Sequence, residues 1–424
     1  MSSAENFLAS LIDFERNTKV NYEFKLDRFR SFLHSIKDPQ DKLNNVIIIA
    51  GTKGKGSTAA FIDSALRACQ LKTGLYTSPH IFSARERIKF NGGKISQNDL
   101  SRLVNKIKSQ ARKFDITYFE AMTAIAFLFF LEKKPDYTIL EVGLGGRLDA
   151  TNVVKPIVSV ITRIGYDHTN ILGKTLTKIA REKTGIIKSK AFVVISAQRP
   201  SALKIIKQKI RKTKNRYCET EKEFEVSSIV NNIKGSRFTI RNKGDFETKM
   251  LGNHQIENAL NAIAVLSYLK EKDLRITDTG VKLGIKTAQI PARCQIISKN
   301  PLIIVDGAHN PESAQALYKV INDIIKRKAI VVFGASQGKS VKEMFRILVP
   351  ITEKIILTQS INPRHIAASQ LAEILAQYKI PFITTNSVKM AIKQGLKLAN
   401  KKTPLVITGS FYVASEALKI LKPV

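Results

Sequence analysis

The sequence predicts an α/β fold built from buried parallel sheets, and three observations support this prediction. Short apolar runs rich in Val and Ile alternate along the chain with amphipathic stretches of helical period. The runs are continuous rather than alternating, which is typical of strands covered by helices on both faces. Two of them, residues 46–50 and 302–305, lead into a glycine-containing turn followed by a helical pattern. Right-handed crossovers between the strands are expected.

The pattern places each element in order along the chain. Strands are expected at residues 46–50, 137–142, 156–161, 192–195, 302–305, 330–333, 354–357 and 405–408, and helices at 58–70, 120–133, 311–326 and 367–378. A helical stretch from about Asn258 carries the chain away from the first sheet, and a new series of strands begins after Pro291. We therefore predict two domains, residues 1–290 and 291–424, with a ligand-binding cleft between them.

Composition and length are typical of a globular protein of two or three domains. The 424 residues are 44% apolar and 25% charged. The longest strongly apolar stretch, residues 122–131, is about half of a membrane span, so no membrane partner is expected. The N-terminal residues lack the pattern of a signal peptide. The three cysteines, Cys69, Cys218 and Cys294, have neither metal-ligand spacing nor a paired framework, which favours a reducing cytoplasm.

The chain is strongly basic, with 69 Lys and Arg against 35 Asp and Glu and a formal net charge of +34. Such a charge attracts polyanions, including nucleic acid, ATP or a polyglutamate tail. The alternative is lysine-rich solvated faces, because the basic residues are spread along the chain, with the densest cluster at residues 204–214. A nucleic-acid footprint would concentrate charge beside a recognisable module, so no nucleic-acid partner is expected.

A glycine-rich loop follows the first predicted strand, with the sequence Gly-Thr-Lys-Gly-Lys-Gly-Ser-Thr at residues 51–58. Glycines let backbone N–H groups approach phosphates, and the dipole of the following helix attracts anions. Lys55 can contact the β- and γ-phosphates, and Ser57 can ligate Mg²⁺. The spacing differs from the common phosphate loop because Lys55 precedes Gly56. The alternative is a glycine-rich turn that binds no phosphate.

This loop resembles the ATP loop of the Mur ligase superfamily, and further motifs resemble its folylpolyglutamate synthase and dihydrofolate synthase branch. The matches follow in order across nearly the whole chain, at residues 77–80, 117–120, 141–152, 167–168, 180–187, 254–258, 306–311 and 409–410. The run Glu-Val-Gly-Leu-Gly-Gly-Arg-Leu-Asp-Ala-Thr-Asn at 141–152 is the most specific. The resemblance implies a monomer with a P-loop-type Mur ligase central domain and a smaller, Rossmann-like C-terminal α/β domain.

A metal site is expected at the edge of the first sheet. Glu141 lies near the end of the strand at 137–142, and ligands of open parallel sheets bind at the carboxyl edge. A carboxylate near a phosphate loop suits Mg²⁺, which prefers oxygen ligands. The resemblance assigns Mg²⁺ contacts to Ser57, Ser78, Glu141 and His168. Taken by itself, His168 is typical of a helix-capping or core histidine.

Lys183 lies in a helical stretch with basic neighbours and, taken by itself, is typical of an exposed helix lysine. The resemblance implies instead that Lys183 is carbamylated and, as the carbamate, holds a second Mg²⁺. A desolvated lysine has a lowered pKa and a nucleophilic neutral amine, so addition of CO₂ is chemically reasonable.

A pterin and a benzoate need flat, partly apolar surfaces with a few polar anchors. The resemblance assigns folate binding to ten positions: Tyr22, Glu23, Phe24, Thr117, Tyr118, Phe119, Glu120, Leu148, Asp149 and Ala150. The alternative for Phe119 is ordinary helix packing, and the alternative for Tyr22 is surface exposure.

The resemblance also assigns nucleotide contacts and catalytic positions in both predicted domains. The nucleotide contacts are Gly54, Lys55, Gly56, Ser57, Asn258, Arg293 and Asp306, and the catalytic positions are Lys55, Lys183, Asp306 and His309. The planar fork of an arginine suits phosphate. The alternative for Asp306 is a helix N-cap, and the two roles are compatible. The chain departs from the family at Ala292 and Cys294, where Gly and an aromatic residue are common.

The implied reaction joins L-glutamate to a folate in two steps. A folate carboxylate attacks the γ-phosphate of ATP to give an acyl phosphate, and the glutamate amine then displaces phosphate. The substrates implied are ATP, L-glutamate and dihydropteroate, tetrahydrofolate or both. A muramyl-peptide ligase is a rival, against which the matches at 117–120 and 148–150 argue. A basic nucleic-acid-binding P-loop protein is favoured by charge alone.

Overall fold

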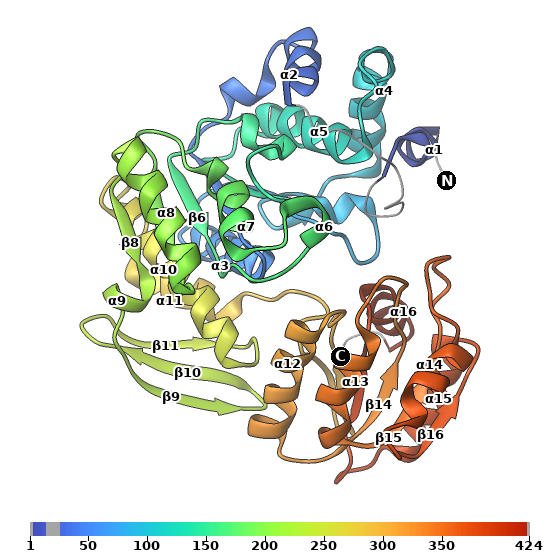
Figure 1. The fold of residues 1–424 in the computed structure, drawn as a ribbon. Coiled ribbons are helices and arrows are strands. Elements are labelled where there is room, and N and C mark those ends of the chain that lie inside the picture. The colour runs from blue at the N-terminus through green and yellow to red at the C-terminus, as the bar shows by residue number, and fades with distance from the viewer. Residues whose placement is uncertain (1–2, 14–25, 422–424) are drawn as a thin grey trace. The chain divides into compact units, whose positions relative to one another are not determined.

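The computed structural model describes residues 3–13 and 26–421, and the chain forms two compact units. The first unit comprises residues 1–228, 239–246 and 255–288, and the second comprises 229–238, 247–254 and 289–424 (Figure 1). The chain therefore passes between the units several times around residues 229–254. The functional division that the sequence predicts after residue 290 stays a prediction.

The first unit is built on an eight-stranded sheet in the order β4-β3-β2-β5-β1-β6-β7-β8. Strands β2, β5, β1, β6, β7 and β8 are parallel neighbours, whereas β3 and β4 add an antiparallel edge. The bounds are β1 Val46–Ala50, β2 Thr73–Tyr76, β3 Ile88–Phe90, β4 Gly93–Lys94, β5 Tyr137–Glu141, β6 Val158–Ile161, β7 Phe192–Ile195 and β8 Tyr217–Glu219.

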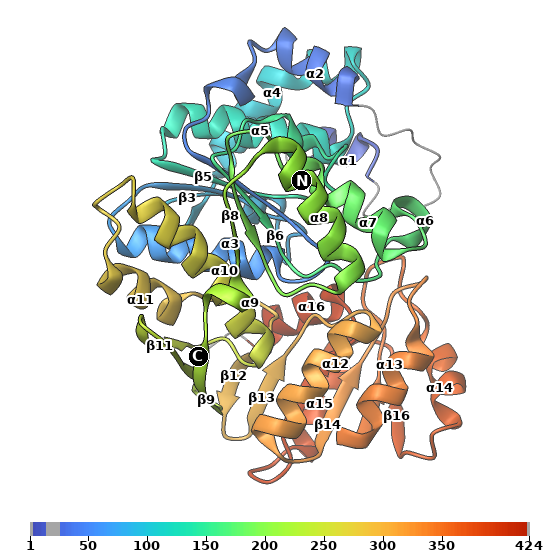
Figure 2. The same ribbon diagram turned by 60° about the vertical axis from the view of Figure 1, so that its left-hand side comes forward.

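Helices cover this sheet and bury both of its faces. Val46, Ile48 and Ala50 of β1 belong to one core cluster with residues of α1, α2, α4, α5, α7 and α8, and α3 contacts β1, β2 and β5 (Figures 1 and 2). Every residue of β1 is buried, which explains its unbroken Val/Ile run. The helices are α1 Ser3–Ser10, α2 Leu26–Ser35, α3 Lys55–Ala68, α4 Gln97–Lys113, α5 Tyr118–Lys133, α6 Thr169–Leu172, α7 Leu176–Lys183, α8 Pro200–Thr213, α9 Thr220–Glu223, α10 Asn253–Lys270 and α11 Asp278–Thr287.

The second unit is built on a six-stranded sheet in the order β12-β13-β17-β14-β15-β16. Its strands are parallel except for β12, which pairs antiparallel with β13. The bounds are β12 Gln295–Lys299, β13 Leu302–Val305, β14 Ala329–Phe333, β15 Thr352–Leu357, β16 Phe382–Thr384 and β17 Leu405–Thr408. A separate three-stranded sheet, β11-β10-β9, consists of β9 Val226–Asn232, β10 Gly235–Ile240 and β11 Gly244–Thr248.

Helices also lie on the second sheet. Residues of α12, α13 and α14 form one core cluster with residues of β13, β14, β15 and β17. Helix α15 contacts β14, and helix α16 contacts β17. The helices are α12 Pro311–Lys319, α13 Val341–Leu348, α14 Ala368–Ala376, α15 Val388–Leu398 and α16 Phe411–Leu421, and α12 continues into the π-helical turn Val320–Ile325. The predicted α/β class with two parallel-rich sheets is confirmed. In the described part of the chain no helix is long and apolar enough to cross a membrane.

Two glycines let α11 approach α3, the helix that follows the phosphate loop. A Cβ atom on Gly284 would lie 2.2 Å from Cα of Ala65, and one on Gly280 would lie 2.4 Å from Sγ of Cys69. The glycines are four residues apart and therefore share one face of α11. Their missing side chains set the distance between the two helices.

Gly284→Ala is expected to destabilise the first unit, because the new methyl group would overlap the backbone of α3 and force the helices apart. We expect a loss of at least about 1–3 kcal/mol of unfolding free energy, the usual cost of overpacking, visible as a lower midpoint of thermal unfolding. Gly93→Ala is the matched control, because the nearest atom to its Cβ would be Phe90 O at 3.5 Å. Equal midpoints for the two variants would contradict this account.

Candidate active site

The phosphate loop lies between β1 and α3, as the sequence predicts. Gly54 is the N-cap of α3 and has φ 90°, a conformation that favours glycine. A Cβ atom at residue 54 would lie 2.1 Å from Oδ1 of Asn258, so Asn258 of α10 borders the loop. The first backbone N–H groups of α3 and the positive end of its dipole face the loop. No side chain caps this turn, so these N–H groups are not taken up by a capping side chain.

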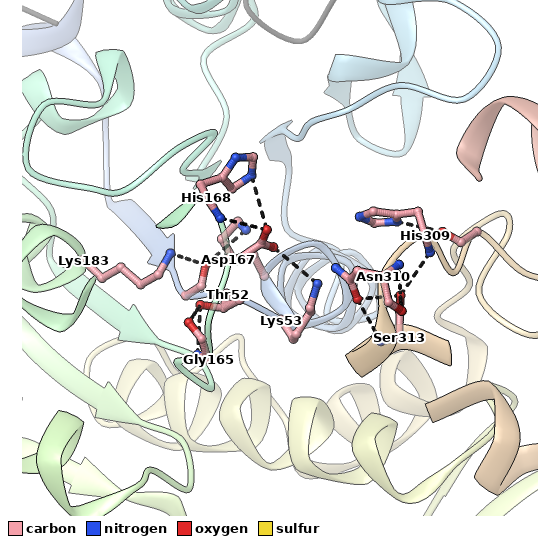
Figure 3. A network of polar contacts seen from close by, with 12 residues as sticks. Thr52, Lys53, Gly165, Asp167, His168, Lys183, His309, Asn310 and Ser313 are labelled. Carbon is pink, nitrogen blue, oxygen red and sulfur yellow. Dashed lines mark hydrogen bonds and ion pairs between the residues drawn. The ribbon is translucent and has the colours of Figure 1, made fainter. Parts of the chain in front are cut away.

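A second loop, which follows β6, is tied to the phosphate loop by polar contacts (Figure 3). Thr52 Oγ1 donates to Gly165 O at 3.1 Å and accepts from Gly165 N–H at 3.0 Å. Lys53 forms an ion pair with Asp167 at 3.4 Å, and the other carboxylate oxygen of Asp167 accepts the N–H of His168 at 3.0 Å. Asp167 therefore links the phosphate loop to the backbone of His168.

Glu141 ends β5 and is buried against the start of α3. Its Oε2 accepts the N–H of Ser78 at 3.0 Å and would lie 3.4 Å from a Cβ atom on Gly56. Ser57 is buried in the same first turn of α3. The structure thus brings together three of the predicted metal positions.

The fourth position, His168, lies on the loop that Asp167 links to the phosphate loop. Its side chain is 54% exposed, so the alternative of a core histidine is wrong. His168 is the N-cap residue of α6, but its side chain makes no capping hydrogen bond.

The donor set around Glu141 fits a hard cation. Among residues 3–13 and 26–421, no three His, Cys, Asp or Glu side chains are grouped closely enough to hold a metal by themselves. A cation beside Glu141 would therefore rely on hydroxyl and phosphate oxygens as well as on this carboxylate. That combination suits Mg²⁺, which commonly keeps few protein ligands and binds substrate phosphates.

Lys183 is buried, so the alternative of an exposed helix lysine is wrong. It ends α7, is 4% exposed, and its Nζ donates to Gly51 O at 2.8 Å. Lys55 Nζ donates to the same carbonyl oxygen at 3.2 Å. Burial, reinforced by the nearby charges of Lys55 and Lys53, lowers the pKa of Lys183 to about 7. A large fraction of this lysine is therefore a neutral amine at physiological pH.

The predicted folate positions at the start of α5 have clear structural roles. Thr117 is the N-cap of α5 and forms a reciprocal capping box with Glu120, whose carboxylate also pairs with Arg28 at 2.8 Å. Tyr118 is 5% exposed, and Phe119 is half-buried. Because Phe119 packs against Tyr76 at 5.9 Å between ring centroids, helix packing accounts for part of its surroundings. The predicted positions Tyr22, Glu23 and Phe24 lie outside the described residues.

Asp149 is the hydrogen-bonding centre of the loop that follows β5. Its carboxylate accepts N–H bonds from Leu144 at 2.9 Å and from Thr151 at 3.0 Å, and it accepts the Thr151 hydroxyl at 2.6 Å. Burial raises the pKa of Asp149 although these hydrogen bonds oppose the shift. Leu148 is half-buried and Ala150 is buried on either side of it.

In the second unit, Asp306 joins two turns. One carboxylate oxygen accepts the N–H of Cys294 at 2.8 Å, and the other accepts the N–H of Ala308 at 2.8 Å. Burial raises the pKa of Asp306, opposed by the charge of Arg293. The alternative of Asp306 as a helix cap is wrong, because Asn310 is the N-cap of α12.

Asn310 caps α12 through a capping box with Ser313 (Figure 3). His309 precedes this cap, and its Nδ1 lies 2.9 Å from Gly307 O. The sequence departures at Ala292 and Cys294 both have left-handed φ values, 55° and 44°, a conformation in which glycine costs less.

Several residues near these positions were not among the predicted site residues. Lys53 occupies a variable position of the loop motif, and Asp167 belongs to a matched motif but has no predicted role. Arg87 is 1% exposed, donates from Nε to His80 Nδ1 at 2.9 Å and lies 5.2 Å from the ring centroid of Tyr118. Its burial had no signal in the sequence, because residues 84–87 are a polar run that is typical of a surface turn.

Comparison with known proteins identifies the family. Residues 49–266 match the Mur ligase middle domain, and residues 292–411 match the Mur ligase glutamate ligase domain. A dihydrofolate synthase/folylpolyglutamate synthase of Bacillus subtilis is 34% identical over 94% of this chain and 95% of its own.

Solved structures show the same fold over nearly the whole chain. Escherichia coli FolC in complex with DHPP and ADP has a TM-score of 0.86 at 27% identity, over 99% of this chain and 98% of its own. A bifunctional folylpolyglutamate synthase/dihydrofolate synthase of Yersinia pestis, complexed with AMPPNP and a Mn ion, has a TM-score of 0.86 at 28% identity, with the same coverage. The chain therefore belongs to the Mur ligase family and, within it, to the dihydrofolate synthase/folylpolyglutamate synthases.

Proposed function

We propose that this protein is an ATP- and Mg²⁺-dependent ligase that joins L-glutamate to folates. Both dihydropteroate, which gives dihydrofolate, and tetrahydrofolate, which gains a polyglutamate tail, are proposed as acceptors. The observation that carries the proposal is the phosphate loop of residues 51–56, which is bordered by Glu141 and buried Lys183. The B. subtilis relative is named for both activities, and the E. coli structure holds DHPP and ADP. We expect a monomer that binds neither nucleic acid nor membrane.

The nucleotide is proposed to bind at the start of α3, with Gly54, Lys55, Gly56 and Ser57 around its phosphates. Asn258 borders the same loop, and Arg293 and Asp306 of the second unit are the further proposed contacts. Ser57, Ser78, Glu141 and His168 would hold one Mg²⁺, and carbamylated Lys183 a second. Bound Mg²⁺ would neutralise charge on the phosphates.

The proposed reaction has two steps. An oxygen of the folate carboxylate attacks the γ-phosphorus, the bond to ADP breaks, and an acyl phosphate forms. The neutral glutamate amine then attacks the acyl carbon, and inorganic phosphate leaves as the amide forms. Lys55 would hold the γ-phosphate in line and offset its charge, and Asp306 and His309 would serve the second step. Most of the rate would come from positioning and charge neutralisation.

The proposed folate site comprises Tyr22, Glu23 and Phe24, the start of α5, and the loop centred on Asp149. Phe119 provides aromatic surface there and Leu148 provides aliphatic surface, and Tyr118 and Ala150 are buried beside them. Thr117, Glu120 and Asp149 hold the backbone of the two segments in place through their own hydrogen bonds. In this arrangement the three polar residues shape the site, and the apolar residues beside them contact the pteroate.

Release of ADP, followed with each acceptor in turn, tests the proposed function. We expect glutamate-dependent turnover with dihydropteroate and with tetrahydrofolate, and none with a muramyl-peptide precursor. Lys55→Ala is expected to lower kcat by about 100-fold or more, the usual effect of removing one charge-stabilising donor. Lys94→Ala, an exposed lysine on β4, is the control. Turnover with the muramyl precursor, or a fully active Lys55→Ala variant, would refute the assignment.

Lys183 is expected to carry a CO₂ adduct in the native protein. The neutral amine attacks CO₂ and releases one proton, so the adduct measured by native mass spectrometry should increase as pH rises through about 7. Lys183→Ala should lose activity, with partial recovery on addition of a short carboxylic acid. An unmodified lysine at pH 8 with dissolved CO₂ present, together with a fully active Lys183→Ala variant, would exclude this role.

The same lysine makes stability depend on pH when CO₂ is absent. Its pKa is lower in the folded protein than in the unfolded chain, so between about pH 7 and 10 the unfolded chain binds more protons. Lys183 should therefore make the free energy of unfolding increase with pH across this window. Lys183→Met, compared with the wild type by urea unfolding at pH 7 and 9, should show a smaller increase.

The ion pair between Lys53 and Asp167 is expected to affect metal activation more than stability. Both side chains are about 30% exposed or less, and such pairs contribute about 1 kcal/mol or less. Lys53→Met should raise the Mg²⁺ concentration for half-maximal activity by about two- to fivefold, because the loop carrying His168 loses one anchor. Lys53→Arg keeps the charge and is the control.

Asp167→Asn tests whether this effect comes from the pair. Asparagine keeps an oxygen for the N–H of His168 but removes the charge. If the pair is responsible, Lys53→Met should cost little in the Asp167→Asn background. Full additivity of the two effects would show that the residues act separately.

A further inference from the structure

Phe411 contacts two side chains to which the proposed function assigns roles. It is the first residue of α16, and its ring centroid lies 4.8 Å from the guanidinium carbon of Arg293. The imidazole of His309 lies on the same ring, with centroids 5.0 Å apart and planes tilted by 40°. The three side chains are half-buried and come from three segments that are distant in the sequence.

Hydrogen bonds fix the backbone beneath these side chains. Asp306 accepts N–H bonds from both Cys294 and Ala308, and the N–H of Gly307 donates to Ala292 O at 2.9 Å. The turn that carries Arg293 and the turn that carries His309 are therefore joined by two hydrogen bonds, and a third holds the second turn in shape. Because the backbone is held, the directions of the Arg293 and His309 side chains depend on the groups that the guanidinium and the imidazole contact.

His309 has one direction fixed locally. Its Nδ1 lies 2.9 Å from Gly307 O, and because a carbonyl oxygen can only accept, Nδ1 carries the proton. In the neutral ring Nε2 is then the acceptor. The contact with Phe411 limits rotation of the imidazole about this hydrogen bond and so fixes the direction of Nε2.

The absence of a side chain at Gly307 is a second, independent indication that the Phe411 ring must occupy this position. A Cβ atom on Gly307 would lie 2.6 Å from both Cδ1 and Cε1 of Phe411. The φ angle of Gly307 is not in the left-handed region, so an alanine there is not excluded by backbone conformation. The missing side chain makes room for the ring.

We propose that Phe411 is a positioning residue, whose ring sets the direction of the Arg293 guanidinium and of the His309 imidazole. The inference rests on the proposed function, which places Arg293 on the nucleotide and His309 at the glutamate-transfer step. The negative face of an aromatic ring attracts a guanidinium, and a half-buried site strengthens this attraction. An aliphatic side chain of similar size would fill the space but would not attract Arg293.

Kinetics of a set of variants test the inference. Phe411→Leu should raise KM for ATP and lower kcat, with a fall in kcat/KM of about 5- to 20-fold, consistent with loss of a partly desolvated cation–π contact. Phe411→Tyr keeps the ring and should restore most of the activity. Phe333→Leu is the control for packing, because Phe333 is a fully buried aromatic residue of the same unit that packs against Phe345. Phe333→Leu should lower the thermal midpoint without changing KM for ATP.

Gly307→Ala provides a second route to the same effect. The new methyl group should displace the ring and lower kcat/KM by about as much as Phe411→Leu. In a Phe411→Ala background the obstruction is gone, so Gly307→Ala should then cost less than about twofold. Equal costs of Gly307→Ala in the two backgrounds would overturn the inference, because the glycine would then act independently of the ring.

A spectroscopic measurement separates this inference from the proposed function. Ring-current shifts of the Arg293 side-chain N–H and of the His309 ring protons, observed by NMR, should disappear in Phe411→Leu whether or not the wild type ligates glutamate. Calorimetric binding of ADP should weaken in the same variant. A wild type without ligase activity would refute the proposed function. Unchanged shifts and unchanged ADP affinity in Phe411→Leu would overturn the inference, because the ring would then only fill space.

Discussion

The carbonyl oxygen of Gly51 is the point on which the phosphate loop depends. Lys55 and buried Lys183 both donate to it, and Lys53 lies on the same loop. Three lysines at one loop oppose one another electrostatically, and this repulsion contributes to the lowered pKa of Lys183. Asp167 offsets part of the charge by pairing with Lys53. The remaining excess of positive charge is a direct physical reason for the loop to bind a polyanion such as a triphosphate.

The position of this loop is set by the packing of uncharged residues. Helix α3 is held on one side by the buried strand β1 and on another by α11, where Gly280 and Gly284 permit close contact. The phosphate-binding end of α3 and its packing face are therefore parts of one rigid element. A small change in the distance between α3 and α11 would move the N–H groups that face the loop, although neither glycine is near it in sequence.

Much of the fold could be predicted because each central strand is buried on both faces. Strands β1, β7, β13 and β17 have the predicted bounds, since all of their residues are buried and their apolar runs give way to polar residues or glycine where the strands end. The short strands at or next to the sheet edges could not be predicted: β3, β4 and β16 span two or three residues each and are partly exposed. Helix α3 begins at Lys55, three residues before the predicted start, because the glycine loop itself forms its first turn.

The candidate site could be predicted less completely than the fold, and the reason is physical. A motif identifies which residues occur together, but burial and partner geometry decide what each one does. Lys183 could not be distinguished from an exposed helix lysine by its neighbours in sequence, because its burial depends on its contact with Gly51, 132 residues away. The contact of Phe411 with Arg293 and His309 likewise depends on three separate segments of the second unit.

The acidic residues assigned to the site share a property that bears on how it functions. Glu120, Asp149 and Asp306 each accept a backbone N–H of their own segment, Asp306 also accepts the N–H of Cys294, and all three are buried. Removing one of these carboxylates leaves buried donors unpaired, at a cost of about 1–3 kcal/mol. Loss of activity in an alanine variant would therefore report a displaced loop as readily as a lost substrate contact. In the proposed folate site, each acidic residue would therefore act on the substrate through the neighbours that it holds in place.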